Sequence, residues 1–317
     1  MIHIVFCIHD EDGSYIQHTA VTMTSVFCHT SAAVTVHLVH DDTLTEENRD
    51  KLTQLTNQYN QKIEYYHIEQ SDFEEAVLKL KYASLKGSFS LGTLYRLKIA
   101  EILPIDKVLY LDSDIVVNID IQSLWNIDLD QYYIAAVRDL KATRRKITNK
   151  IHFKKMGFSA DQYFNAGVIL FNLKILREEM ALFNDAISFL LKHSTDAIFF
   201  DQDALNALLQ KKTLLLPAMY NFIPVSLQPQ KVSDNLPAII HFAGPKPWKY
   251  KCSQFDWMYW KYFTKTSWGN TLEKLLMAQK DVTIDLGYAF YMGEIGSRRM
   301  FLDGFFFRAK KILGQCF

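Results

Sequence analysis

The sequence lacks the features of several protein classes. Its longest apolar runs, such as residues 166–171, fall far short of the roughly 18 to 20 residues that a helix needs to cross a bilayer. Its four cysteines are scattered without CxxC spacing, which argues against a disulfide framework or a zinc site. Thirty-five Lys and Arg balance thirty-five Asp and Glu, so the molecule has no overall attraction for nucleic acid. We therefore expect no spanning helix, no structural disulfide and no nucleic-acid partner.

The first residues also lack export and phosphate-loop signals. Residues 1–6 have no basic segment and no small-residue cleavage site, so we interpret them as a first strand and expect the chain to stay in the cytoplasm. No GxGxxG or GxxxxGK[ST] pattern is present. A nucleotidyltransferase is expected to carry a glycine-rich, basic phosphate loop near its N-terminus, whereas residues 9–13 are acidic, which disfavours that class.

What the chain does have is enough apolar surface for a large core. Hydrophobic residues make up 49% of its 317 residues and charged residues 22%, which excludes a chain that is disordered throughout. From the start to about residue 115, short β-branched runs alternate with longer helical periods, the pattern of a layered α/β domain. The expected strands are 2–8, 34–39, 63–67, 107–111, 134–137, 163–173, 214–216 and 238–242.

Helical periods connect these strands. Thr43 and Glu46 predict a capping box in front of a surface helix. Further helices are expected over 93–103, over 176–190 and from residue 201. Residues 141–155 are instead dense in Lys and Arg with little apolar periodicity, so we expect a mobile loop there.

The composition shifts beyond Trp248, where aromatic and basic residues become frequent. We place a boundary there, with one domain over 1–248 and a mostly helical appendage over 249–317. The last residues mix arginine and lysine with phenylalanine, the composition of an amphipathic segment that lies on a membrane surface. The alternative is that these aromatic side chains pack back onto the main domain.

The most informative pattern is Leu109-Tyr110-Leu111-Asp112-Ser113-Asp114, a hydrophobic strand that ends in two carboxylates. Two neighbouring carboxylates repel each other, and a cation between them keeps both ionised. Hard oxygen ligands favour Mg²⁺ or Mn²⁺. Taken alone, such a pair is more often a solvated cap at the end of a strand.

A second strand also opens into a polar loop, over residues 239–248. His241 can supply a third, nitrogen ligand, although a histidine at a strand end is usually a plain, partly buried residue. Gly244 permits close backbone approach, and Lys246 carries a cation that suits a phosphate. Trp248 is interpreted as a packing residue.

Together these residues resemble glycosyltransferase family 8, the retaining enzymes with a GT-A fold that include bacterial lipopolysaccharide galactosyl- and glucosyltransferases. The resemblance covers most of residues 2–250 and rests on five blocks in order: 2–12 with 21–26, 94–97, 109–114, 163–168, and 201–203 followed by 241–248. It implies an α/β GT-A fold with a Rossmann-like mixed central sheet flanked by helices. It also implies that Asp112, Asp114 and His241 hold Mn²⁺ (or Mg²⁺) against the diphosphate of a UDP-sugar donor.

The resemblance assigns roles to further residues. Those expected to bind the donor are His9, Asp10, Arg96, Asp112, Ser113, Asp139, Asn165, Gly167, Gly244 and Lys246, and those expected to support catalysis are Asp201 and Gln202. Outside the resemblance each has a plainer interpretation. Arg96 is then a surface cation, Asn165 and Asp139 are turn or loop residues, and Asp201 is a helix N-cap.

Two features depart from the family pattern. The first strand usually ends in an acidic pair, and here His9 takes the first place while residues 10–13 lengthen the turn, which bears on the contacts to base and ribose. The loop from His241 to Trp248 is one residue shorter than the commonest form, which bears on the placement of Lys246.

The resemblance implies hexosyl transfer with retention of configuration. The metal ion and Lys246 would stabilise the leaving diphosphate. Because Gln202 is an amide and a poor nucleophile, same-face substitution is favoured, with a phosphate oxygen as base and Gln202 or Asp201 supporting the carbocation. Residues 141–155 would be either a lid that excludes water from the donor or a solvated loop.

The predicted function is transfer of glucose or galactose from a UDP-sugar to a glycan or lipid-linked glycan acceptor at the inner membrane face, with peripheral membrane contact through the C-terminal segment. Lipopolysaccharide core, a teichoic or capsular intermediate and a glycoprotein all stay open as acceptors. The alternative is a catalytically silent UDP-sugar or glycan-binding module of the same fold. The intact Asp112, Asp114, His241 and Lys246 disfavour that alternative, whereas the altered His9 leaves it open.

Overall fold

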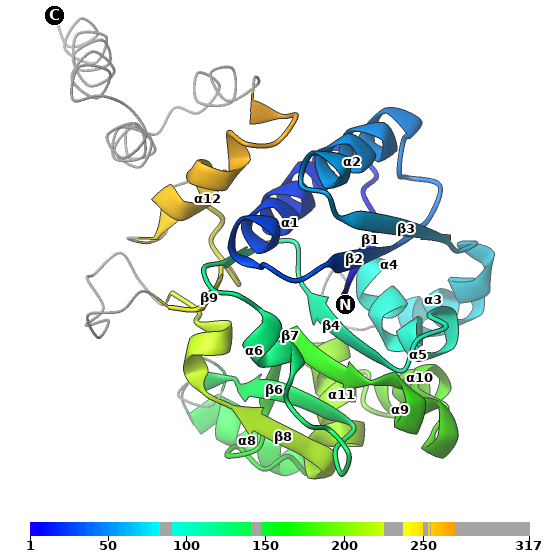
Figure 1. Ribbon diagram of the computed structural model, residues 1–317. Coiled ribbons are helices and arrows are strands. Elements are labelled where there is room, and N and C mark those ends of the chain that lie inside the picture. Colours follow the sequence, from blue (N-terminus) through cyan, green and yellow to red (C-terminus); the bar gives the residue numbers. More distant parts are fainter. Residues whose placement is uncertain are drawn as a thin grey trace, which may run out of the picture.

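The computed structural model describes residues 1–82, 91–140, 142, 147–224, 237–249, 253 and 255–269 (Figure 1). Its centre is a seven-stranded sheet of order β3-β2-β1-β4-β7-β6-β8. The strands are β1 (Ile2–Ile8), β2 (Val34–His40), β3 (Lys62–His67), β4 (Lys107–Leu111), β6 (Ile134–Arg138), β7 (Phe164–Asn172) and β8 (Thr213–Leu216). A two-stranded sheet joins β5 (Ile115–Val117) to β9 (Ile239–His241). The predicted mixed α/β sheet is confirmed.

The main sheet has a parallel half and an antiparallel half. β3, β2, β1 and β4 run parallel, whereas β7 runs antiparallel to both β4 and β6. The carboxyl end of β4 therefore lies beside the start of β7, where Leu111 pairs with Val168. The N–H of Asp112 donates to the carbonyl of Gly167 at 2.9 Å. Polar side chains that follow one strand and precede the other are brought to the same edge, as is usual for sites in open α/β sheets.

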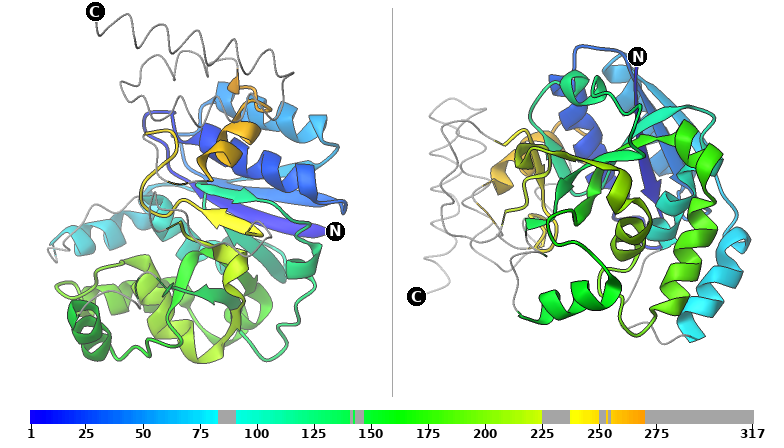
Figure 2. Two further views of the ribbon diagram at one scale, coloured as in Figure 1. Left: turned by 90° about the vertical axis from the view of Figure 1, so that its left-hand side faces the viewer. Right: turned by 90° about the horizontal axis from the view of Figure 1, so that it is seen from below.

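Helices cover both faces of this sheet, as Figure 2 shows in its left view. Along β1, Ile4 and Phe6 join the core on one face and Val5 the core on the other, as the two-residue period of a strand requires. The first face carries α1 (Ile16–His29), α2 (Glu46–Gln58) and α12 (Asp256–Phe263). The second carries α3 (Ser71–Tyr82), α4 (Leu91–Tyr95), α5 (Ile99–Ile102), α8 (Ile147–Met156), α9 (Leu173–Glu179), α10 (Leu182–Lys192) and α11 (Asp201–Leu209). A short helix, α6 (Gln122–Trp125), follows β5.

Some helix predictions were wrong in detail. The N-cap of α2 is Thr45, whose side chain accepts the Asn48 N–H, while the predicted cap Thr43 hydrogen-bonds Asp41 instead. The predicted helix over 176–190 is divided into α9 and α10, because the backbone is extended at Met180. The predicted helix over 93–103 is α4, a 3₁₀ turn over Arg96–Lys98 and then α5.

The prediction of a loop over 141–155 was also wrong where the structure describes it, since residues 147–156 form α8. His152, Phe153 and Met156 of this helix are buried. So few apolar positions left no clear helical period in the sequence. The lid prediction rests on residues that include 141 and 143–146, which lie outside the described residues.

The predicted appendage begins before α12, yet α12 packs on α1. Tyr259 and Tyr262 are buried, and their hydroxyls lie 2.6 Å from ring nitrogens of His18 and His29. Residues 270–317, which include the predicted membrane-surface segment, lie outside the described residues. Among the helices that are described, none combines the length and apolar character needed to cross a membrane.

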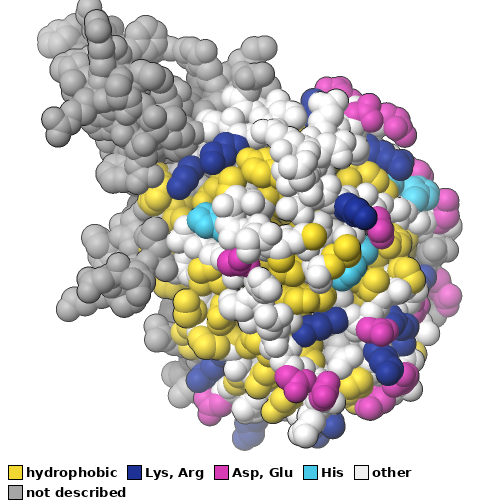
Figure 3. Space-filling model, viewed as in Figure 1, with side chains coloured by type: hydrophobic (Ala, Val, Ile, Leu, Met, Phe, Trp, Pro, Cys, Tyr) yellow, Lys and Arg dark blue, Asp and Glu magenta, His cyan; other side chains and the backbone are white. Residues whose placement is uncertain are grey.

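The described surface mixes charges of both signs. On the face shown in Figure 3, Lys and Arg side chains alternate with Asp and Glu rather than gathering in one extended basic area. This distribution agrees with the balanced composition of the sequence.

Candidate active site

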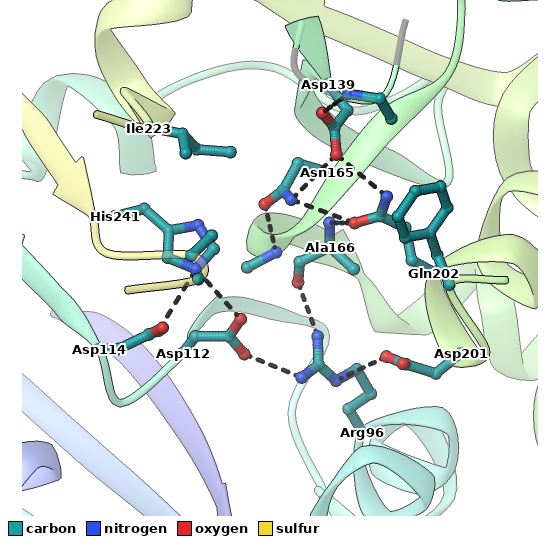
Figure 4. Close-up of a pocket in the computed structure, with 15 residues that line it drawn as sticks. Arg96, Asp112, Asp114, Asp139, Asn165, Ala166, Asp201, Gln202, Ile223 and His241 are labelled. Carbon is teal, nitrogen blue, oxygen red and sulfur yellow. Dashed lines mark hydrogen bonds and ion pairs between the residues drawn. The ribbon is translucent and has the colours of Figure 1, made fainter. Parts of the chain in front are cut away.

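A pocket of about 400 Å³ opens where β4 ends and β7 begins (Figure 4). The predicted site residues that line it are Arg96, Asp112, Asp114, Asp139, Asn165, Gly167, Asp201, Gln202, His241 and Gly244. The lining residues that sequence reasoning missed are Ala142, Ala166, Phe199, Ile223 and Ala243. These five are small or apolar and carry no chemical pattern, and their only sequence clue is their proximity to the predicted ones.

Three ligating side chains converge at one end of the pocket. Atoms of Asp112, Asp114 and His241 lie within 4.8 Å of one another. His241 Nε2 is 3.3 Å from Asp114 Oδ1 and 3.6 Å from Asp112 Oδ2. The small second sheet creates this proximity, because Ile115 of β5 pairs with His241 of β9. Two carboxylates and one imidazole form a donor set that suits Mn²⁺ or Mg²⁺, so the residues fit the predicted ion.

The orientation of His241 is set by Asn221. Its Nδ1 lies 2.9 Å from Asn221 Oδ1, while the amide nitrogen of Asn221 donates to Asn165 Oδ1 at 2.8 Å. Since Oδ1 of Asn221 can only accept, Nδ1 of His241 donates, and the lone pair of Nε2 is directed toward the two carboxylates. Such support of a ligating histidine by a second hydrogen bond is usual at metal sites. Sequence reasoning missed Asn221.

Charge around Asp114 favours its ionised form. Burial alone acts against the carboxylate, but His241 and Lys246 outweigh it and hold the pKa of Asp114 well below its ordinary value. Lys246 Nζ contacts the Asp114 carboxylate and donates to the carbonyl of Phe242 at 3.1 Å. We call Asp112, Asp114 and His241 the acidic group. Lys246 contacts this group but does not line the pocket.

Arg96 joins the two sides of the pocket. Its Nη2 donates to Asp112 at 2.8 Å, its Nη1 to the carbonyl of Ala166 at 2.9 Å, and its Nε lies 3.2 Å from Asp201. The guanidinium lies 4.6 Å from the ring centre of Tyr110, and Arg96 as a residue is 8% exposed, so it is not a surface cation. Burial raises the pKa of Asp201 to about 6, against the opposing effect of Arg96.

An amide network forms the opposite wall. Gln202 Oε1 accepts from the N–H of Ala166 at 3.0 Å and from Asn165 at 3.1 Å. Its Nε2 donates to Asp139 at 3.1 Å and to the hydroxyl of Tyr163 at 3.3 Å. Asn165 in turn accepts from Asn221, so the network runs without a break from Gln202 to the ring of His241.

The loop that precedes α11 has a strained backbone and is held by hydrogen bonds. Phe200 has φ 44° and ψ −110°, a backbone conformation that side-chain-bearing residues rarely adopt. Asp203 holds this loop by accepting from the N–H groups of Ile198 and Phe199 at 2.8 and 2.9 Å. Asp201 is the first residue of the helix rather than its N-cap, which corrects that interpretation. Asp203 belongs to a recognised sequence block, but no role was predicted for it.

Besides Lys246, three predicted donor-binding residues lie outside the lining. Both carboxylate oxygens of Asp10 accept from backbone N–H groups at the start of α1. His9 Nδ1 lies 2.6 Å from Asp41 Oδ2, and Ser113 Oγ lies 2.8 Å from Thr19 Oγ1. Each is engaged by the protein, so the donor contacts of these three residues stay predictions.

Comparisons with known proteins agree with this geometry. The family model of Glycosyl transferase family 8 matches residues 3–252. A Haemophilus influenzae protein is 30% identical over 256 residues, which cover 78% of this chain and 74% of its own. The lipopolysaccharide 1,2-glucosyltransferase of Escherichia coli is 26% identical over 249 residues, 75% of this chain and 70% of its own.

Among solved structures, the galactosyltransferase LgtC in complex with donor and acceptor sugar analogues superposes with a TM-score of 0.71. The two chains are 24% identical, and the match covers 85% of this chain and 99% of LgtC. At this identity the likeness speaks for the fold, and the predicted GT-A fold is confirmed.

Proposed function

The chain belongs to glycosyltransferase family 8, and on that premise we propose that it is a metal-dependent, retaining hexosyltransferase. It moves glucose or galactose from a UDP-sugar to a glycan or lipid-linked glycan acceptor. The observation that carries the proposal is the convergence of Asp112, Asp114 and His241 within 4.8 Å at one end of a polar pocket.

Asp112, Asp114 and His241 would hold Mn²⁺ or Mg²⁺. When bound, the ion neutralises charge that develops on the departing diphosphate. The chain prepares these ligands in advance, because Arg96 fixes Asp112 and Asn221 fixes His241. Preorganised groups of this kind stabilise a transition state without having to reorganise during the reaction.

The opposite wall, formed by Asp139, Asn165 and Gln202, is a sugar-binding surface in this proposal. Its amide and carboxylate groups are buried, hydrogen-bonded and held in one arrangement. Such groups suit the recognition of hydroxyl positions, because an unpaired buried polar group is costly.

Retention proceeds by same-face substitution in this proposal. Gln202 is an amide whose oxygen and nitrogen each make two hydrogen bonds, which favours a role beside the developing carbocation over nucleophilic attack. Asp201, the carboxylate next to it, is paired with Arg96 and is thereby less available as a nucleophile. A hexosyl group trapped on Asp201 in mass spectrometry would overturn this assignment.

One relative supports the proposed acceptor class. The name of the Escherichia coli relative places it in lipopolysaccharide synthesis, which supports a cell-surface glycan precursor as the acceptor here. In this proposal the transferase domain spans 1–248, and the C-terminal segment brings the enzyme to the inner membrane face.

The test begins with thermal stability. UDP with Mn²⁺ should raise the melting temperature, and EDTA or Asp112→Asn should abolish the rise, because binding to the native state stabilises it. Asp106→Asn is a matched control, since this exposed carboxylate pairs only with the surface residue Arg177 among its described contacts. Release of UDP from UDP-glucose or UDP-galactose then separates an enzyme from a silent module, which would bind the donor without turnover.

A further inference from the structure

Lys246 lies on the loop that follows β9, next to the carboxylate of Asp114. The chain leaves His241, turns at Gly244 with φ 122°, and closes a turn in which the Lys249 N–H donates to the carbonyl of Lys246 at 3.0 Å. The side chain of Lys246 is 22% exposed and contacts the carboxylate of Asp114. Its ammonium group thus lies at the edge of the predicted metal site, on a side chain that is partly exposed.

The far end of this loop is docked on helix α1. The ring of Trp248 stacks on that of His18, with centroids 3.6 Å apart and an interplanar angle of 16°. His18 is 4% exposed, and its Nδ1 lies 2.6 Å from the hydroxyl of Tyr259. Burial holds the pKa of His18 at about 3, so the ring is neutral near pH 7. The stack is therefore a contact between two uncharged rings.

The same turn of α1 also holds the acidic loop. Thr19 Oγ1 lies 2.8 Å from Ser113 Oγ, and Thr22 Oγ1 donates to the carbonyl of Ile115 at 2.7 Å. His18, Thr19 and Thr22 lie on one face of the helix, since residues three and four apart are neighbours. A single turn of helix thus supports both the loop of Asp112 and Asp114 and the loop of Lys246.

We propose that His18 is a positioning residue for an anionic ligand: through its stack with Trp248 it fixes the loop over 243–249, so that Lys246 is available to the phosphate groups of a nucleoside diphosphate. The inference rests on the proposed function, because it requires a diphosphate at the acidic group. His18 does not touch that ligand and acts through Lys246.

A matched control lies on the same helix. His29, in the last turn of α1, also bonds a tyrosine of α12, with Nε2 2.6 Å from the Tyr262 hydroxyl. The two histidines join the same pair of helices by hydrogen bonds of the same length. Of these two histidines, His18 is the one that stacks on Trp248, a ring that also lies 5.0 Å from the ring of Tyr259. If His18 only held α12 in place, replacing His18 and replacing His29 should have similar effects on UDP affinity.

The experiment compares affinities for UDP and for uridine, each with Mn²⁺, by titration calorimetry. His18→Ala should weaken UDP about tenfold, the scale of one displaced charge-assisted hydrogen bond, and should leave uridine unchanged because uridine has no phosphate. His18→Phe keeps a ring against Trp248 and should restore most of the UDP affinity. His29→Ala should change neither ligand. In a Lys246→Ala background, His18→Ala should have no further effect, since coupled residues are not additive.

Three results would overturn the inference. One is unchanged UDP affinity in His18→Ala, another is an equal loss for UDP and uridine, and the third is an additive loss in the Lys246→Ala background. If His18→Ala does not fold, Trp248→Ala, which removes the ring that stacks on His18, decides by the same comparison of UDP with uridine. A wild-type protein that binds no UDP in the presence of Mn²⁺ would instead contradict the proposed function, and this inference with it.

Discussion

Gly167 and His241 lie so close together that no side chain fits between them. A Cβ atom on Gly167 would lie 2.2 Å from Cε1 of His241 and 2.8 Å from Oδ2 of Asp112. Distances under 3.0 Å do not occur for real Cβ atoms, so both predicted metal ligands would have to move. Glycine at this position is a condition for the geometry of the acidic group.

Gly167→Ala should therefore lower the affinity for Mn²⁺ by at least tenfold, because displacement of the groups that orient ligands typically costs that much. The Mn²⁺ dependence of the thermal shift with UDP measures it. Gly157→Ala serves as a control: its φ of 74° makes alanine costly to stability, but nothing lies within 4 Å of the added atom. Equal Mn²⁺ affinity in wild type and Gly167→Ala would refute the assigned metal group.

Asn221 is not one of the predicted metal ligands, but it should affect the affinity for Mn²⁺ through its hydrogen bond to His241. Asn221→Leu removes the acceptor for His241 Nδ1 and should weaken Mn²⁺ about 10- to 100-fold. Asn221→Asp keeps the acceptor oxygen but loses the donor to Asn165, so most of the affinity should return. Electron paramagnetic resonance of free Mn²⁺ in a titration reports the affinity without turnover. The idea fails if the two variants bind Mn²⁺ alike.

Gln202→Glu should destabilise the protein in a pH-dependent way. The change replaces the amide donor to Asp139 by a carboxylate, so two like charges face each other across a bond of 3.1 Å. Repulsion raises the pKa of the pair in the folded state, which then binds more protons than the unfolded state. Stability should fall by about 1–3 kcal/mol at pH 8 and recover in part at pH 5. Urea unfolding at both pH values, beside wild type, tests this, and a loss that grows toward pH 5 would contradict it.

Buried neutral histidines predict a loss of wild-type stability in mild acid. Burial lowers the pKa of His18 to about 3 and that of His37 to about 4, from the ordinary histidine value of 6.5. A lowered histidine pKa contributes stability above pH 6.5, and this contribution is lost as the pH falls toward the folded value. The free energy of unfolding should drop by on the order of 1 kcal/mol per histidine between pH 7.5 and pH 5.

His37→Leu isolates one of these groups. Nε2 of His37 lies 2.8 Å from Nδ1 of His3, and neither residue lines the pocket. The variant should show a shallower fall in stability between pH 7.5 and pH 5 than wild type, measured by urea unfolding, whatever its stability at pH 7.5. An unchanged slope would show that His37 does not drive the acid sensitivity.

Local patterns in the sequence predicted the strands of the main sheet and much of the site. When helices cover both faces of a sheet, its strands are fully buried and appear in the sequence as short β-branched runs. Such runs predict strands even when the neighbouring strands are not known. The pair Asp112 and Asp114 was recognisable because it follows such a run directly, and His241 because it ends another. Loops after strands are where α/β proteins bind ligands, which made these positions informative.

The remaining features depend on contacts between segments far apart in the chain. A strand over 238–242 was predicted, but β5 has only three residues, too few for a periodic pattern, and its pairing with β9 is what places His241 beside the two aspartates. Asn221 is an ordinary residue of a 3₁₀ turn until it meets the ring of His241.

The sequence by itself thus determined the sheet, the family blocks and the ligand types that a divalent cation prefers. Only the tertiary structure decided how these groups are held: Gly167 against His241, Asn221 behind it, and Trp248 on His18. The physical reason is that periodicity and strand ends are properties of a few consecutive residues, whereas close packing and the pairing of buried polar groups arise only when distant segments meet.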